Sequence, residues 1–194
     1  MFVSAVVLAA GQSTRMGTNK LLLPWRGSTI IAHVCERLNT AGVNEIIVVT
    51  GQDHVNVEAA VSSKCVFNER YASGIASSIR TGILASSPDS DGFLVCLGDL
   101  PEAPFAEVLA RVSDIPAIPT HLTQRGHPVW LPRSMRSELL GLPDQDQGAS
   151  RLLQAMSVNC FEAGPSCLAD IDTMDDYVNG LSDEPQSEGP TKSH

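Results

Sequence analysis

The first stretch that could do chemistry follows an apolar run near the start of the chain. Residues 5–8 read Ala-Val-Val-Leu, a run too short for most helices, and they predict a buried strand. Small and polar residues follow, among them Gly11, Arg15, Gly17 and Lys20. Glycines let backbone N–H groups approach a phosphate chain closely, and the two cations add positive charge in the same place. This layout predicts a polyphosphate-binding site.

The spacing of this loop excludes two common phosphate-binding motifs. A P-loop reads G-x-x-x-x-G-K-[ST], whereas here five residues separate Gly11 from Gly17 and Lys20 lies three residues further on. The dinucleotide fingerprint G-x-G-x-x-G is also absent from the loop. The alternative to a phosphate site is an ordinary glycine-rich turn after a buried strand.

A second candidate centre is a carboxylate at the end of another predicted strand. Residues 92–97 read Gly-Phe-Leu-Val-Cys-Leu, and Asp99 follows them after a glycine. Ligands of open parallel sheets gather outside the carboxyl ends of the strands. A polyphosphate needs Mg²⁺, which prefers a few hard oxygen ligands. Asp99 is therefore a candidate metal ligand, and the alternative is that it caps a helix beginning at Pro101.

A third element places a glycine and two serines at the start of a predicted helix. The stretch runs Gly74-Ile-Ala-Ser-Ser-Ile-Arg-Thr-Gly82. Backbone N–H groups at a helix start can meet a phosphate or the edge of a base. Gly74 and Ser78 are candidate nucleotide contacts, with helix capping by the serines as the alternative.

The elements that must position these residues alternate between strand and helix. Apolar runs predict further strands over residues 45–50 and 64–67. A helix is predicted between the strand at residues 5–8 and the strand at residues 45–50, with Ser28 or Thr29 as its cap and Gly42 at its end. Strand–helix–strand units of this length imply parallel strands with right-handed crossovers. We expect an α/β fold: a three-layer, mostly parallel, Rossmann-like sheet with helices on both faces. Residues 1–180 form one domain, and the polar residues 181–194 are expected to be a disordered tail.

Five further features are predicted along the second half of the chain. Residues 116–121 predict a short strand and residues 123–126 a turn, before a helix that ends near Leu140. Residues 169–177 predict a short strand followed by a capping box from Thr173 to Asp176.

The composition narrows the classes of partner. The 194 residues carry a net charge of −9 with a pI near 4.9, which argues against binding to nucleic acid or to an anionic membrane. No stretch is apolar enough to span a bilayer, and the N-terminus lacks the features of a signal peptide, so a cytoplasmic location is expected. Five scattered cysteines form no C-x-x-C pair and support neither a zinc site nor a redox motif.

The first motif also carries a family resemblance. The stretch Leu8-Ala-Ala-Gly-x-Ser-x-Arg-Met-Gly-x-x-Lys20 resembles the signature loop of nucleotidyltransferases with the sugar-nucleotide pyrophosphorylase fold. More narrowly, it is similar to the MobA-like molybdenum cofactor nucleotidyltransferases, and the resemblance runs from about residue 3 to 180. It implies that the nucleotide is bound by Leu8, Ala9, Ala10, Gly11, Arg15, Gly17, Lys20, Gly74, Ser78 and Asp99.

The resemblance extends to a metal site and an acceptor site. The segment Asp170-Ile-Asp-Thr173 resembles the family's terminal motif, which implies that Asp172, or alternatively Asp170, shares Mg²⁺ or Mn²⁺ with Asp99. The segments around His127, Gly148 and Arg151 resemble acceptor-side elements, although an inserted Ser150 shifts Arg151 by one position.

The resemblance implies transfer of a cytidylyl group from CTP to the terminal phosphate of a molybdopterin-type cofactor, with Lys20, Arg15 and Asp99 as catalytic residues. In the family, the loop reads Leu-Ala-Ala-Gly in enzymes that use CTP and Leu-Ala-Gly-Gly in enzymes that use GTP. The resemblance therefore implies that the Ala10 methyl group narrows the pocket and excludes a purine base. The product would pass to an apo-enzyme of the xanthine oxidase family. Two alternatives stay open: a sugar-phosphate or alditol-phosphate nucleotidyltransferase, and a cofactor carrier without catalysis.

Overall fold

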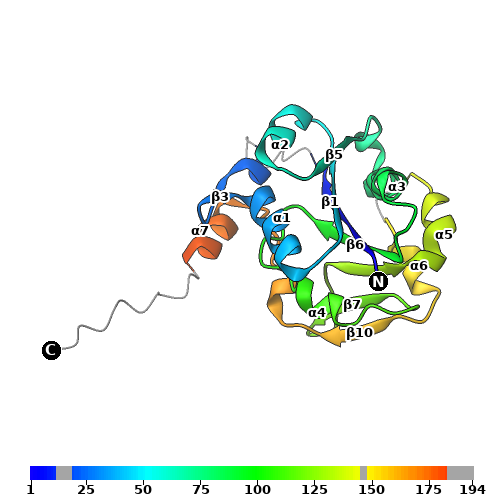
Figure 1. Cartoon of the computed structure of the whole chain (residues 1–194). Coiled ribbons are helices and arrows are strands. Elements are labelled where there is room, and N and C mark those ends of the chain that lie inside the picture. The colour runs from blue at the N-terminus through cyan, green and yellow to red at the C-terminus, as the bar shows by residue number, and fades with distance from the viewer. Residues whose placement is uncertain (12–18, 145–147, 183–194) are drawn as a thin grey trace.

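The computed structural model describes residues 1–11, 19–144 and 148–182, and one eight-stranded sheet forms its centre (Figure 1). The strands are β1 (Val3–Ala9), β4 (Glu45–Thr50), β5 (Lys64–Phe67), β6 (Gly92–Leu97), β7 (Ala117–His121), β8 (Gln124–Arg125), β9 (Val129–Pro132) and β10 (Asn159–Glu162). Their order is β10-β7-β9-β6-β1-β4-β5, with β8 paired to β7. Strands β1, β4, β5 and β6 run parallel, whereas β9 is antiparallel to both β6 and β7.

Helices cover both faces of this sheet. They are α1 (Ile30–Ala41), α2 (His54–Ala60), α3 (Ile75–Ala85), α4 (Phe105–Leu109), α5 (Arg136–Leu140), α6 (Ser150–Gln154) and α7 (Met174–Ser182). Side chains alternate along β1, so Ala5 and Val7 pack in the cluster with α1, α2 and α4, while Val6 and Leu8 face the side of α3. Helices α3, α5 and α6 share the opposite cluster (Figure 1). The predicted three-layer α/β class is confirmed.

Local sequence explains the ends of the first helix. The Thr29 side chain accepts a hydrogen bond from the Ala32 backbone N–H, and Gly42 ends the helix in the left-handed conformation at φ +90°. Ile30, Ile31 and Val34 are fully buried on one side of the helix. The predicted helix and both of its end residues are confirmed.

Helix α3 lies unusually close to β1. A Cβ atom at Gly82 would be 2.2 Å from Val6 Cγ1, so the absence of a side chain allows the helix to approach the strand. This close packing brings the start of α3, with Ile75 and Ser78, to the carboxyl end of β1 at Leu8.

A small hairpin holds the last helix. Strands β2 (Pro24–Trp25) and β3 (Ser28–Thr29) pair in a second sheet, and Trp25 is buried. Tyr177 of α7 donates a hydrogen bond from its hydroxyl to the Pro24 carbonyl at 2.6 Å, and its ring centroid lies 6.1 Å from that of Trp25. The domain end predicted at residue 180 therefore falls inside α7, and residues 183–194 of the predicted tail lie outside the described residues.

Several sequence predictions of local structure were wrong. Helix α4 begins at Phe105 rather than at Pro101, and residues 169–172 form no strand. Strands β9 and β10 were not predicted, and the turn expected over residues 123–126 contains the short strand β8. No helix in the described part of the chain is long and apolar enough to cross a membrane.

Candidate active site

Three carboxylates meet at the carboxyl end of β6. Asp99 follows that strand, and its backbone carbonyl accepts a hydrogen bond from the Ile171 N–H at 3.0 Å. Ile171 is buried in the core, and the side chains of its neighbours Asp170 and Asp172 reach towards Asp99. One carboxylate oxygen from each of the three residues lies within 4.8 Å of the other two. The two alternative second ligands from the sequence thus belong to one cluster.

Lys20 joins this cluster as its cation. It begins the 3₁₀ helix η1 (Lys20–Leu22), and its Nζ lies 2.7 Å from Asp99 Oδ2 and 2.6 Å from Asp172 Oδ1. Burial acts to lower the pKa of Lys20, but the two carboxylates outweigh it and the pKa is raised above its ordinary value. Lys20 therefore carries a fixed positive charge.

The cluster has the donor set of a divalent metal site. Burial raises the pKa of Asp170, and the negative charges of Asp99 and Asp172 raise it further. Two oxygens bound to one Mg²⁺ lie at most about 4.2 Å apart, so small shifts of these side chains would complete a coordination shell. Asp99 does not cap a helix, because the residue before α4 is Pro104. The capping alternative for Asp99 was therefore wrong.

A cavity of about 420 Å³ opens beside Asp99, between β1 and the start of α3. Its lining includes six residues that the sequence assigned to the nucleotide: Leu8, Ala10, Gly11, Gly74, Ser78 and Asp99. Ala9, a seventh, is absent from the lining, because strand alternation places its side chain in the core beside α1. The cavity is therefore built from the ends of β1 and β6 and the helix start that the sequence singled out.

Ser78 is held by a buried amide. The Nδ2 group of Asn68, at 4% exposure, donates to Ser78 Oγ at 3.0 Å and to Ser77 Oγ at 2.8 Å. Ser77 in turn donates to the Gly74 carbonyl, and no side chain caps α3. The serines therefore fix the loop of residues 68–74 against the helix rather than capping it, and the capping alternative was wrong.

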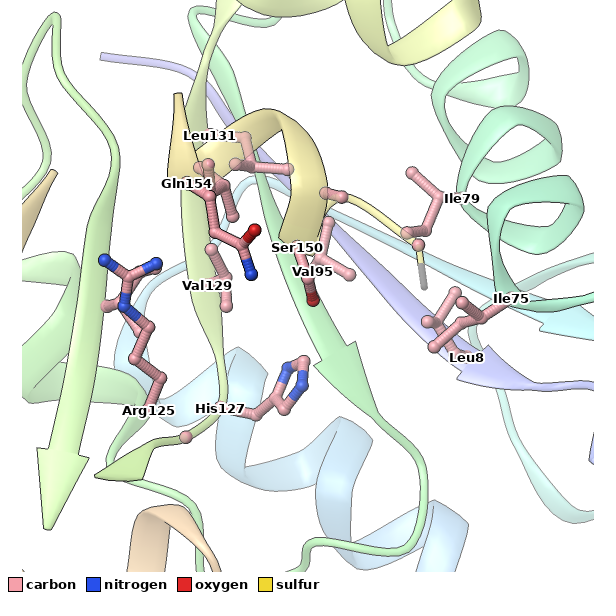
Figure 2. A pocket seen from close by; sticks show the side chains of 15 residues that line it. Leu8, Ile75, Ile79, Val95, Arg125, His127, Val129, Leu131, Ser150 and Gln154 are labelled. Atoms are coloured by element: carbon pink, nitrogen blue, oxygen red, sulfur yellow. The ribbon is translucent and has the colours of Figure 1, made fainter. Parts of the chain in front are cut away.

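A second cavity has a volume of about 330 Å³, and Figure 2 shows the side chains that line it. Leu8 and Ile75 line both cavities, so the two form neighbouring parts of one cleft. Figure 2 shows Leu8, Ile75 and Ile79 on one side of it, His127 and Val129 on the other, and Ser150 and Gln154 reaching over it from α6. The walls are largely apolar, as expected of a site for a flat or partly apolar molecule.

His127 lies in this second cavity as a neutral group. Burial lowers its pKa, although a hydrogen bond to the Val95 backbone and the charge of Asp99 act in the opposite direction. Its backbone N–H donates to the Cys167 carbonyl at 2.9 Å, and its Nδ1 is buried with no hydrogen-bond partner among the described residues. Gly148 also lines this cavity, so the structure brings together two of the three predicted acceptor residues.

The remaining predicted residues lie elsewhere. Arg151 is exposed and does not line the cavity, whereas Ser150 and Gln154 of the same helix do. Its place outside the lining agrees with the one-residue shift that the inserted Ser150 causes. Arg15 and Gly17 lie outside the described residues.

Sequence reasoning missed other cavity residues. Tyr71, Ala72, Ile75 and Leu97 line the first cavity, and Leu97 could have been found because it ends the strand that precedes Asp99. Tyr71 carries no such signal, since it lies in the loop before α3. The five cysteines are free thiols, and among the described residues none of them lines either cavity.

The fold and the cleft together define a class. A mostly parallel α/β sheet carries, at the carboxyl ends of β1 and β6, a carboxylate–lysine cluster beside a glycine-lined cavity, which is the arrangement of a nucleotide-binding transferase. The model of the MobA-like NTP transferase domain matches residues 5–160. The chain belongs to the MobA-like family of nucleotidyltransferases.

Individual relatives cover nearly the whole chain. The chain is 29% identical to the purine catabolism protein PucB of Bacillus subtilis and 24% identical to the molybdenum cofactor cytidylyltransferase of Escherichia coli, covering 91% of this chain and 94% of each relative. The crystal structure of Rv0371c from Mycobacterium tuberculosis aligns with a TM-score of 0.82 at 28% identity, over 94% of this chain and 98% of that one. A structure of Rv0371C in complex with manganese aligns with a TM-score of 0.78 at 25% identity, over 94% and 100%.

Proposed function

We propose that this chain transfers a cytidylyl group from CTP to the terminal phosphate of a molybdopterin-type cofactor and releases pyrophosphate. The observation that carries the proposal is the cluster of Asp99, Asp170, Asp172 and Lys20 at the edge of the cavity that Ala10 lines. The name of the Escherichia coli relative supports both the nucleotide and the acceptor.

The reaction needs positioning and charge neutralisation more than acid–base chemistry. An oxygen of the acceptor phosphate attacks the α-phosphorus of CTP, the bond from that phosphorus to the bridging oxygen breaks, and pyrophosphate leaves with that oxygen. The attacking phosphate is already ionised at neutral pH, so no general base is required. The two adjoining cavities would hold the two substrates side by side, which supplies the positioning.

The charged residues would supply the neutralisation. Asp99 and Asp172, with Asp170, would hold Mg²⁺ or Mn²⁺, which neutralises phosphate oxygens when bound. The manganese complex of Rv0371C supports a divalent ion in this fold. Lys20 keeps its proton and would stabilise the charge that develops at the α-phosphate. Arg15, with the backbone from Gly11 to Gly17, is proposed to hold the β- and γ-phosphates.

The choice of base is assigned to Ala10. Its side chain is almost fully buried, with 7% exposure, and it lines the first cavity, here called the nucleotide cavity, next to Gly11. A methyl group at this position reduces the space for a purine, whereas a pyrimidine has one ring fewer to accommodate. The acceptor would lie in the apolar cavity beside His127.

The test is pyrophosphate release with Mg²⁺ and a molybdopterin-type cofactor, measured in parallel with CTP, GTP and ATP. We expect release with CTP and little with the two purine nucleotides. Release with GTP instead would keep the transfer but overturn the role of Ala10. Turnover of sugar phosphates or alditol phosphates, with no turnover of the pterin, would show that the acceptor is one of these phosphates instead. Tight binding of the cofactor without release of pyrophosphate would favour the alternative of a cofactor carrier without catalysis.

A further inference from the structure

One carboxylate outside both cavities connects three segments of the chain. Asp144 accepts hydrogen bonds from the guanidinium groups of Arg70 and Arg80 through its two different oxygens. Arg80 also donates to the backbone carbonyl of Leu142, two residues before Asp144. Side-chain exposure is 21% for Asp144 and 18% for Arg80, so this pair is shielded from much of the solvent. Charge-assisted hydrogen bonds of this kind are stronger than neutral ones.

Both arginines belong to the nucleotide side of the cleft. Arg70 directly precedes Tyr71 and Ala72, which line the nucleotide cavity. Its backbone has a partner at both ends: its N–H donates to Asn68 Oδ1 at 3.0 Å, and its carbonyl lies 2.9 Å from Ser77 Oγ, whose one hydroxyl proton it shares with the Gly74 carbonyl. Arg80 lies on α3, the helix whose first turns line both cavities. The backbones of both arginines are thus held by hydrogen bonds, Arg70 in its loop and Arg80 within α3, while the side chain of Arg70 is 68% exposed.

The carboxylate belongs to the acceptor side. Residues 145–147 lie outside the described residues, and directly after them Gly148, Ala149 and Ser150 line the second cavity, here called the acceptor cavity. Gly148 has φ +50°, and a Cβ atom there would lie 2.8 Å from Ile75 Cγ2, so the backbone rests directly on the start of α3. Helix α6 has only five residues and no side-chain cap, which makes it weak on its own.

We infer that Asp144 is a positioning residue that fastens the acceptor-side wall of the cleft, residues 148–150, to α3 and to the loop of the nucleotide cavity. Its carboxylate lines neither cavity, so it acts through the segments that it joins. The hydrogen bond from Arg80 lowers the pKa of Asp144, so the carboxylate stays ionised to a lower pH than an ordinary aspartate. The function of the wall as an acceptor site rests on the proposed function, but the fastening itself does not.

Hydrogen exchange of the ligand-free protein tests the fastening without any substrate. Asp144→Asn keeps the shape of the side chain and removes its charge. We expect amide exchange in residues 148–155 to accelerate about 3- to 10-fold, with exchange in β1 and β6 unchanged. Asp114→Asn is the matched control, since Asp114 is exposed and has no ion pair among the described residues. Unchanged exchange in Asp144→Asn, or acceleration throughout the chain, would overturn the inference.

Kinetics then test the consequence for the reaction. In the Asp144→Asn variant we expect the KM for the acceptor to rise by a similar factor, while the KM for CTP and kcat at saturating acceptor stay within about twofold. Asp144→Glu, which keeps the charge, should recover part of the loss. High salt should screen the ion pair and raise the KM of the wild type for the acceptor towards that of the Asp144→Asn variant. Equal changes in the KM for CTP and the KM for the acceptor would overturn the positioning role. If exchange is faster in Asp144→Asn but the wild type turns over neither substrate, only the proposed function is rejected.

Discussion

At the scale of single residues, the Asp99 carboxylate contacts the Lys20 ammonium group and lies beside the carboxylates of Asp170 and Asp172, with which it is proposed to share a metal. Asp99→Asn keeps the side-chain shape and removes the charge, so we expect pyrophosphate release from CTP to fall roughly 100-fold or more. Lys20 keeps its contact with Asp172, and the melting temperature should change little. Asp89→Asn, at an exposed aspartate outside both cavities, is the control for both assays. Full activity in Asp99→Asn would contradict the metal role.

Ala10 carries the prediction about nucleotide choice. Ala10→Gly removes one methyl group from the wall of the nucleotide cavity, so the ratio of kcat/KM for CTP over GTP should fall by about 10-fold or more. Ala72→Gly removes a methyl group from the same cavity and should leave the ratio near that of the wild type. If both variants shift the ratio equally, the size of the cavity as a whole, and not Ala10, determines the base.

Single residues could be predicted where a motif ends a strand or starts a helix. Asp99 follows an apolar run, and Gly74 and Ser78 open a helix, so local sequence reveals their place in the cleft. Asp144 could not be found in this way, because its partners lie 74 and 64 residues away and only the folded chain brings them together. For Arg151 the sequence does carry a signal, since the inserted Ser150 shifts it from the family pattern and the structure places it outside the cavity lining.

The elements differ in how clearly the sequence marks them. Strands β1, β4 and β6 are continuous apolar runs because both of their faces are covered by helices. Strand β9 follows a Gly-His-Pro stretch and ends in Pro132, and β10 is an edge strand with mostly exposed residues, so neither has a strong periodic pattern. The strand expected over residues 169–172 does not form, although Ile171 donates a single backbone hydrogen bond to Asp99.

The start of helix α7 gives a prediction at the scale of elements. Thr173 N–H and Oγ1 donate to Asp176 Oδ2 at 2.8 and 2.7 Å, and Asp176 N–H donates back to Thr173 Oγ1 at 3.2 Å, which confirms the predicted capping box. Thr173→Ala should destabilise the helix start by about 0.5–1 kcal/mol, measured as faster exchange of the α7 amides. Thr40→Ala, whose hydroxyl donates only within α1, is the control. Equal protection of α7 in Thr173→Ala and the wild type would contradict this.

The same capping box predicts a pH dependence. The Thr173 hydroxyl and backbone hydrogen bonds lower the pKa of Asp176 below its ordinary value. Its contribution to stability is therefore present above the ordinary pKa of about 3.8 and is lost as the pH falls through the lower, folded-state value. Protection of α7 should decline in that acidic range in the wild type and show no such step in Asp176→Ala. An unchanged step in the variant would assign the titration to another group.

The charge of the whole molecule bears on how the metal and the fold are linked. The chain has 22 acidic and 13 basic residues, and three carboxylates with one lysine meet in the cleft among the described residues. Crowded carboxylates repel one another in the folded state only, so a cation that binds there should stabilise the fold. Saturating Mg²⁺ should raise the melting temperature by about 5 °C, and a chelator should reverse the rise.

The Asp170→Asn variant separates this repulsion from general effects of Mg²⁺ on an acidic protein. Without metal, it should melt slightly above the wild type because one repelling charge is gone, and its rise with Mg²⁺ should be clearly smaller because one ligand is gone. Asp89→Asn removes the same charge from an exposed site and should keep the full rise. If the rise is equal in all three proteins, Mg²⁺ acts on the surface charge as a whole and the cluster is not its site.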